Sequence, residues 1–158
     1  MNAFISYSIS ENEQYILSLL AQKVSETGLT LVTSYNQSDS VDFQTANDIK
    51  TSALFIGLIT SSGRLAKTAR VYSEFKQANL FSRPAILLIE DTITVAPWIS
   101  SYQNTIRFNR YFINQAIEEV KNKIRTSQIP QPNNNAAAWV LGGIAVIALL
   151  SLLSEKEK

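Results

Sequence analysis

Short runs of apolar residues recur along the chain and alternate with stretches of mixed character. The runs cover residues 3–7, 29–33, 53–60, 85–89 and 105–108. Runs of four to eight residues that are apolar almost throughout are typical of strands in a parallel sheet that is covered on both faces. The pattern therefore predicts five strands.

The stretches between these runs repeat apolar residues at helical spacing. The stripes are Ile16, Leu19, Leu20 and Val24; Phe43, Ala46 and Ile49; residues 69–81; and Ile113, Ile117, Val120 and Ile124. Ser10 and Glu13 have the spacing of a capping box, Asp42 is placed to cap the second stripe, and Gly28 stands where a left-handed cap would end the first. We therefore expect a helix after most strands.

Strands that alternate with helices predict an α/β fold, because parallel strands need crossover connections that place helices on both faces of the sheet. The fold class we expect is flavodoxin-like, a doubly wound five-stranded parallel sheet with strand order 2-1-3-4-5. In that topology the ligand crevice opens at the carboxyl ends of strands one and three. The end of the first strand, the polar loop at residues 34–40 and residues 60–63 would surround it.

The last part of the chain has a different character. Residues 136–153 (AAAWVLGGIAVIALLSLL) carry no charge over 18 positions, about the shortest length that spans a bilayer as a helix. We expect a domain at residues 1–126, a Pro- and Asn-rich linker at 127–135, a transmembrane helix at 136–153 and a polar tail at 154–158. The N-terminus has no charged and apolar leader, so a single-pass protein with its domain in the cytoplasm is predicted.

Composition excludes several kinds of chemistry. The chain has 14 Lys and Arg against 13 Asp and Glu, so no basic field favours nucleic acid. It has no Cys and no His, which excludes thiolate and imidazole chemistry and the common zinc sites, and we expect no metal. No GxxxxGK[ST] loop and no GxGxxG after the first strand is present, so the phosphate-binding loops that these motifs form are not expected.

Several motifs resemble the Toll/interleukin-1 receptor (TIR) family. Residues 4–8 (FISYS) resemble the family's opening strand, and residues 68–78 (TARVYSEFKQA) are similar to its third-helix pattern S-x-W-[CV]-x-x-E-x-x-x-A. Residues 84–89 (PAILLI) resemble its fourth strand, and residues 98–108 its closing strand region. The resemblance covers about residues 2–125 and is fairly specific in the order and spacing of the motifs.

The resemblance implies an enzyme that cleaves NAD as a substrate and needs no cofactor. The glutamate of the helix motif is the catalytic residue of NAD-cleaving TIR domains, and it falls on Glu74. The first-strand exit and the loop after strand two line the family's pocket, which implies substrate contacts from Ser6, Tyr7, Ser8, Tyr35 and Asn36. One carboxylate beside the ribose can stabilise the oxocarbenium character that develops as the nicotinamide bond breaks.

The expected function is therefore a membrane-anchored NAD glycohydrolase or ADP-ribose cyclase, active on self-assembly with other TIR domains in antiviral or stress signalling. Its partners would be NAD or a related nucleotide, further TIR domains and a bilayer entered by residues 136–153. The sequence also departs from the family, because Arg70 replaces the motif's Trp and the loop after strand two lacks the RD and Pro-Gly elements. Those departures favour one alternative, a non-enzymatic adaptor or effector that self-associates or senses a nucleotide. A second alternative is a deoxyribosyltransferase-like enzyme of similar fold that uses a carboxylate nucleophile.

Overall fold

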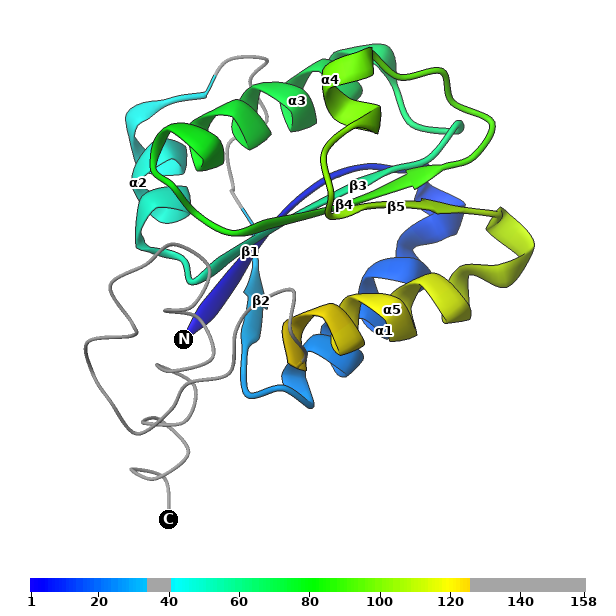
Figure 1. The fold of residues 1–158 in the computed structure, drawn as a ribbon, viewed down its shortest axis with the longest axis horizontal. Coiled ribbons are helices and arrows are strands. Elements are labelled where there is room, and N and C mark those ends of the chain that lie inside the picture. Colours follow the sequence, from blue (N-terminus) through cyan, green and yellow to red (C-terminus); the bar gives the residue numbers. More distant parts are fainter. Residues whose placement is uncertain (34–40, 126–158) are drawn as a thin grey trace.

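The computed structural model describes residues 1–33 and 41–125. Five parallel strands form one sheet in the order β2-β1-β3-β4-β5 (Figure 1). The strands are β1 (Asn2–Ser8), β2 (Thr30–Val32), β3 (Leu54–Ile59), β4 (Ala85–Glu90) and β5 (Thr105–Phe108). The predicted fold class and strand order are confirmed for the part of the chain that the structure describes.

Helices cover both faces of this sheet. They are η1 (Glu11–Glu13), α1 (Gln14–Ser25), α2 (Phe43–Thr51), α3 (Leu65–Leu80), α4 (Pro97–Ser100), η2 (Arg110–Phe112) and α5 (Ile113–Arg125). Figure 1 shows α1 and α5 on one face and α2, α3 and α4 on the other. Every residue of β3 and β4 is buried, as strands between two helical layers should be.

The predicted helix ends are largely confirmed. The Glu13 carboxylate accepts a hydrogen bond from the backbone N–H of Ser10 at 2.8 Å, and Asp42 accepts one from the N–H of Thr45 at 2.7 Å. Gly28 has a φ of 92°, which is the left-handed conformation that favours glycine. The caps formed by Glu13 and Asp42 satisfy backbone donors that the N-terminal end of a helix leaves without a partner.

One predicted boundary and one missed helix need correction. The helix expected at residues 69–81 begins earlier, at Leu65. The prediction missed this start because the first turn carries the exposed Leu65 and polar residues, which form no apolar stripe. The short helix α4 was not expected, since four residues are too few to show a period.

The membrane segment lies outside the described residues. No helix within residues 1–33 and 41–125 is long and apolar enough to cross a bilayer. The predicted linker at 127–135, span at 136–153 and tail at 154–158 all follow the last described residue, Arg125. They therefore remain predictions.

Alternation along β1 divides its side chains between the two layers. Phe4 belongs to the core under α3, together with Phe55, Val71 and Phe75. Ala3 and Ile5 belong to the core that contains α1 and α5, and Tyr7 packs against it. Residues of even number in β1, including Ser6 and Ser8, thus share the α3 face of the sheet.

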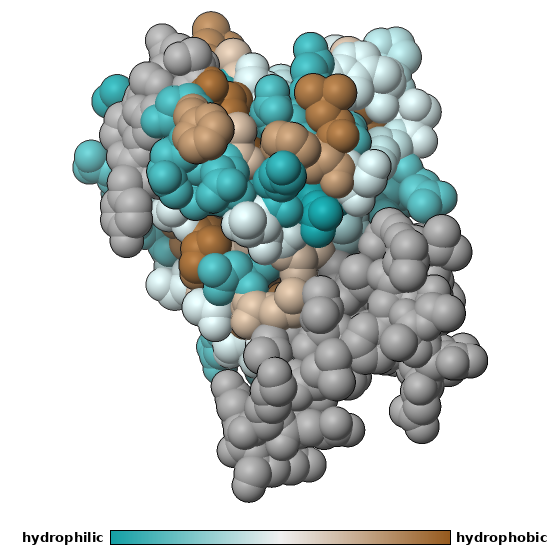
Figure 2. Space-filling model, turned by 90° about the vertical axis from the view of Figure 1, so that its left-hand side faces the viewer, coloured by the Kyte–Doolittle hydropathy of each residue, from teal (hydrophilic) through white to brown (hydrophobic). Residues whose placement is uncertain are grey.

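The surface beside α2 mixes polar and apolar side chains. Figure 2 shows brown patches separated by teal ones on this side of the molecule. Phe43 at the start of α2 and Leu80 at the end of α3 are exposed apolar residues, at 87% and 75%. Among the coloured residues in this view, no single apolar face is formed.

The turn after β3 passes unusually close to the end of β1. An added Cβ at Gly63 would lie 2.2 Å from the hydroxyl oxygen of Ser8 and 2.5 Å from its carbonyl oxygen. Position 63 therefore requires glycine, because any side chain would clash with Ser8. This close approach brings the residues after β3 against the end of β1.

Substitution of Gly63 by alanine is expected to destabilise the protein, because the added methyl group overpacks a contact with backbone. Such overpacking costs about 1–3 kcal/mol. Urea denaturation of the full chain in detergent, followed by circular dichroism, would measure the loss, with Gln115→Ala at an exposed position of α5 as the control. Equal denaturation midpoints for Gly63→Ala and the unsubstituted chain would contradict the close approach.

Candidate functional site

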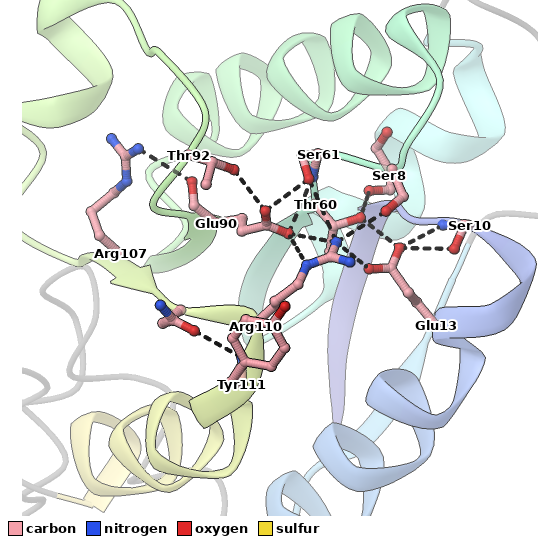
Figure 3. Close-up of polar contacts among 12 residues, drawn as sticks. Ser8, Ser10, Glu13, Thr60, Ser61, Glu90, Thr92, Arg107, Arg110 and Tyr111 are labelled. Atoms are coloured by element: carbon pink, nitrogen blue, oxygen red, sulfur yellow. Dashed lines mark hydrogen bonds and ion pairs between the residues drawn. The ribbon is translucent and has the colours of Figure 1, made fainter.

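Polar and charged side chains meet at the carboxyl ends of four strands. Figure 3 shows Arg110, which follows β5, between Glu13 of η1 and Glu90 at the end of β4. The hydroxyl groups that contact these carboxylates come from Ser10, Thr60, Ser61 and Thr92. We call Glu13, Glu90, Arg110 and these hydroxyl residues the Arg110 clamp.

The Glu13 side of the clamp is fully engaged, although the residue is only 7% exposed. One carboxylate oxygen accepts hydrogen bonds from the Ser10 N–H at 2.8 Å, the Ser10 hydroxyl at 3.0 Å and the Thr60 hydroxyl at 2.7 Å. The other oxygen accepts from Arg110 Nη2 at 3.1 Å. These partners replace the water that burial removes.

The Glu90 side is engaged to a similar degree. Its Oε2 accepts hydrogen bonds from the hydroxyls of Thr92 at 2.6 Å and Ser61 at 2.7 Å, and its Oε1 accepts from Arg110 Nη2 at 2.9 Å. Burial alone raises the pKa of Glu90, but the bonds from Thr92, Ser61 and Arg110 outweigh it and hold the pKa at about 2. The hydrogen bond and charge of Glu90 also raise the pKa of Arg110.

The hydrogen bonding of the clamp suits a structural role better than a catalytic one. A hollow of about 360 Å³ lies beside it, lined by Tyr15, Phe108 and Tyr111 among others. However, both clamp carboxylates already accept several protein hydrogen bonds, and a group with a pKa near 2 is a poor proton donor at neutral pH. The clamp ties the ends of β3, β4 and β5 to η1.

Glu74 lies in a different environment, in the middle of α3. It is 1% exposed, and its Oε1 accepts one hydrogen bond, from Arg70 Nε at 2.7 Å. Arg70 stands one turn earlier on the helix, at the spacing that brings two side chains together. Within the described part of the chain Arg70 is the one hydrogen-bond partner of this carboxylate, so Glu74 is buried with most of its hydrogen-bonding capacity unused.

The structure separates the other predicted site residues. Ser6 is 4% exposed and shares the α3 face of the sheet, where it is paired in register with Gly57 of β3. Ser8 is fully buried, and its hydroxyl bonds the Thr68 hydroxyl at 2.8 Å and the Arg64 carbonyl at 3.2 Å in the first turn of α3.

Tyr7 points to the opposite face of the sheet from Ser6 and Ser8. It lines a shallow groove with Leu17 and Ala21 of α1. It therefore lies across the sheet from Glu74. Tyr35 and Asn36 lie outside the described residues, so their predicted contacts remain predictions.

Sequence reasoning did not identify the clamp as a unit. Glu13 was expected only as a helix cap, while Glu90 and Arg110 were not singled out. A charged residue that directly follows an apolar strand at its carboxyl end is a usable signal, and Glu90 carries it. Arg70 was noted as a departure from a motif, although its spacing of four residues from Glu74 indicates an ion pair.

No group of carboxylates within residues 1–33 and 41–125 is arranged to hold a metal ion. This finding concerns the described residues and agrees with their hydrogen bonding, since Glu13 and Glu90 share the Arg110 cation. The guanidinium of Arg110 already compensates the negative charge of both carboxylates.

Comparisons with known proteins give a structural neighbour and no family. No protein-family model matches the chain, and no curated protein matches its sequence. Among solved structures, the chain is similar to a CMP N-glycosidase of Clostridium botulinum, BcmB, with a TM-score of 0.58 and 16% sequence identity. The match covers 77% of this chain and 98% of that one, and at this identity it shows a shared fold.

Acidification is expected to remove the stabilisation that Glu90 provides. Its pKa in the folded chain is about 2, below the ordinary 4.5, so the contribution is complete above about pH 5 and is lost as the pH falls toward 2. The shift corresponds to roughly 3 kcal/mol at neutral pH.

Urea denaturation of the full chain and of Glu90→Gln at a series of pH values would measure this effect. The stability difference between the two should be largest near pH 7 and should shrink as the solution is acidified. Glu119→Gln, at an exposed position of α5, serves as the control. A difference that stays constant down to pH 2 would contradict the assigned role of Glu90.

Proposed function

We propose that the chain cleaves the N-ribosyl bond of a nucleotide, with NAD as the substrate and Glu74 as the catalytic carboxylate. The observation that carries the proposal is the contrast between the buried carboxylates. Glu13 and Glu90 are engaged by several protein groups, whereas Glu74 is just as buried and accepts one hydrogen bond. A buried carboxylate with unused acceptor capacity is available to a substrate.

The chemistry requires one well-placed anion. As the bond between ribose C1′ and the nicotinamide nitrogen breaks, its electron pair leaves with nicotinamide, and positive charge develops on the ribose. A carboxylate at Glu74 stabilises that charge and accepts hydrogen bonds from the ribose hydroxyls. Attack on C1′ by water, with loss of a proton, gives ADP-ribose, and attack by an adenine nitrogen of the same molecule gives a cyclic product.

Arg70 supports this role. Its guanidinium donates to Glu74 at 2.7 Å and so fixes the position of the carboxylate on α3. Ser6 lies on the same side of the sheet as α3 and is a candidate for a polar contact with the ribose. Tyr7 does not join this group, because its side chain faces α1.

Two similarities support the reaction class. A CMP N-glycosidase shares the fold, and its name describes cleavage of an N-glycosidic bond in a nucleotide. The resemblance of residues 4–8 and 68–78 to TIR motifs supports NAD as the substrate and Glu74 as the acting residue. The similarity of fold supports an N-glycosyl hydrolase in general, and the TIR-like motifs support cleavage of NAD by Glu74.

The apolar segment at residues 136–153, together with the resemblance, supports a cellular setting for the enzyme. We infer that residues 136–153 anchor the chain in a membrane as a single-pass protein, with the α/β domain in the cytoplasm. Confinement to two dimensions raises the local concentration of the domain and so favours self-assembly. An assembled NAD-consuming enzyme of this kind would serve antiviral or stress signalling.

A second candidate function is a non-enzymatic adaptor or effector. The ion pair between Arg70 and Glu74 favours it, because Arg70 already neutralises the carboxylate and the side chain of Glu74 is only 2% exposed. In that case the same pair would hold α3 in place for a binding surface. The two candidates differ in whether assembled protein consumes NAD.

Substitution of Glu74 by glutamine should abolish NAD turnover, because an amide cannot supply the negative charge that stabilises the transition state. We expect a loss of at least about a hundredfold in rate. The assay uses full-length protein at high concentration in detergent, with products separated by chromatography.

Glu119→Gln, which alters an exposed carboxylate on α5, should keep the activity of the unsubstituted chain. Turnover in Glu74→Gln equal to that of the unsubstituted chain would contradict the role of Glu74. Absence of NAD turnover in the assembled, unsubstituted protein would favour the adaptor instead.

A further inference from the structure

Arg70 has more hydrogen-bonding capacity than its surroundings use. A guanidinium carries five N–H donors, and within the described part of the chain Arg70 uses one of them, Nε, to bond Glu74. The side chain is only 15% exposed, so most of it is shielded from water. A shielded guanidinium with donors to spare is suited to an acceptor supplied by a ligand.

The helix places a second cation beside this pair. Lys67 precedes Arg70 by three residues and Glu74 by seven, so all three lie on one flank of α3. Lys67 is partly buried and forms no ion pair with the described residues. Tyr72 and Lys76 lie on the other flank, where both contact the ring of Trp98.

This row of charges matches the charge distribution of a nucleotide. The Arg70–Glu74 pair is neutral as a whole, with its negative end at Glu74 and its remaining donors on Arg70. In a nucleotide the 5′-phosphate is attached, through the 5′ oxygen, to the same ribose whose C1′–N bond is cleaved. A phosphate on Arg70 and Lys67 would keep negative charge away from the carboxylate while the anomeric carbon lies beside it.

We propose that Arg70, with Lys67 as a second cation, recognises a phosphate on the ribose at which Glu74 acts. The substrates are then 5′-phosphorylated N-ribosides, such as nicotinamide mononucleotide or NAD, and nucleosides that lack the phosphate are poor ligands. The inference rests on the proposed function for its site. It adds the determinant of the substrate class, and it assigns a role to the residue that replaces the Trp of the TIR motif.

Binding can be measured independently of turnover. The probes are nicotinamide mononucleotide and nicotinamide riboside, which differ only in the 5′-phosphate, titrated calorimetrically into full-length Glu74→Gln protein in detergent. Nicotinamide mononucleotide should bind about tenfold or more tightly than the riboside. Adding Arg70→Gln should remove most of that preference, Arg70→Lys should restore part of it, and Lys67→Gln should reduce it less.

Lys76→Gln is the matched control, because it removes a cation from the opposite flank of the same helix and should leave the preference unchanged. Equal affinity for the two probes, absence of binding by either, or an unchanged preference in Arg70→Gln would overturn the inference. A role for Arg70 in holding the fold alone would weaken binding of both probes equally and leave their ratio unchanged.

Kinetics distinguish this inference from the proposed function. If the unsubstituted chain turns over NAD, Arg70→Gln should raise KM for nicotinamide mononucleotide by about ten- to a hundredfold relative to the riboside. If no substrate is consumed while the phosphate preference in binding depends on Arg70, the proposed reaction fails and the recognition role stands. If both probes are turned over with equal kcat/KM, the proposed reaction stands and the phosphate-recognition role of Arg70 fails.

Discussion

A carboxylate that is taken out of water needs hydrogen bonds or a positive charge in return, and three glutamates of this chain are almost completely buried. Glu13, Glu74 and Glu90 are 7%, 1% and 2% exposed. An unpaired charge in such a place would cost several kcal/mol, so the positions of Arg70 and Arg110 follow from those of the glutamates. The arrangement of charge in the domain is built around this requirement.

The two arginines meet the requirement in different ways. Arg110 reaches Glu13 and Glu90 across long stretches of sequence, and the hydroxyls of Thr60, Ser61 and Thr92 complete the bonding. The Arg110 clamp therefore fixes the carboxyl ends of the sheet. Arg70 pairs with Glu74 within one helix, and neither side chain is saturated. A fully hydrogen-bonded cluster is suited to a structural role, whereas the unused donors of Arg70 and acceptors of Glu74 could bond a ligand.

This difference also accounts for the location of the candidate chemistry. In doubly wound sheets the ligand crevice is found beyond the carboxyl ends of the strands, and in this chain the clamp occupies part of that edge. Glu74 lies on α3, on the face of the sheet that Ser6 and Ser8 share. The Ser8 hydroxyl is bonded to Thr68 and Arg64, whereas the Ser6 hydroxyl forms no hydrogen bond within the described residues.

The central strands β3 and β4 could be predicted from the sequence because each is a nearly continuous apolar run, as expected for strands that are buried on both faces. The edge strands β2 and β5 are only partly buried, and they were predicted as short runs between helical stripes. Gly28, Asp42 and the Ser10–Glu13 pair marked helix ends, because caps depend on residues a few positions apart. The start of α3 was misplaced, since Leu65 is 88% exposed and contributes nothing to a buried stripe.

The site was predictable only where its parts are close in sequence. Arg70 and Glu74 are four residues apart, so their pairing follows from the helix. Arg110 and Glu13 are 97 residues apart, and no local pattern indicates that the winding of the chain brings them together. Tyr7 was expected beside Ser6 and Ser8, but adjacent residues of a strand face opposite sides of the sheet.

The most direct test of the account is a crystal structure of the full-length Glu74→Gln protein with NAD bound. The account predicts that the nicotinamide ribose lies against the substituted side chain at position 74, on the α3 side of the sheet, with the adjoining phosphate on Arg70. A ribose bound instead beside Glu13 and Arg110, or beside Tyr7 on the opposite face, would contradict it.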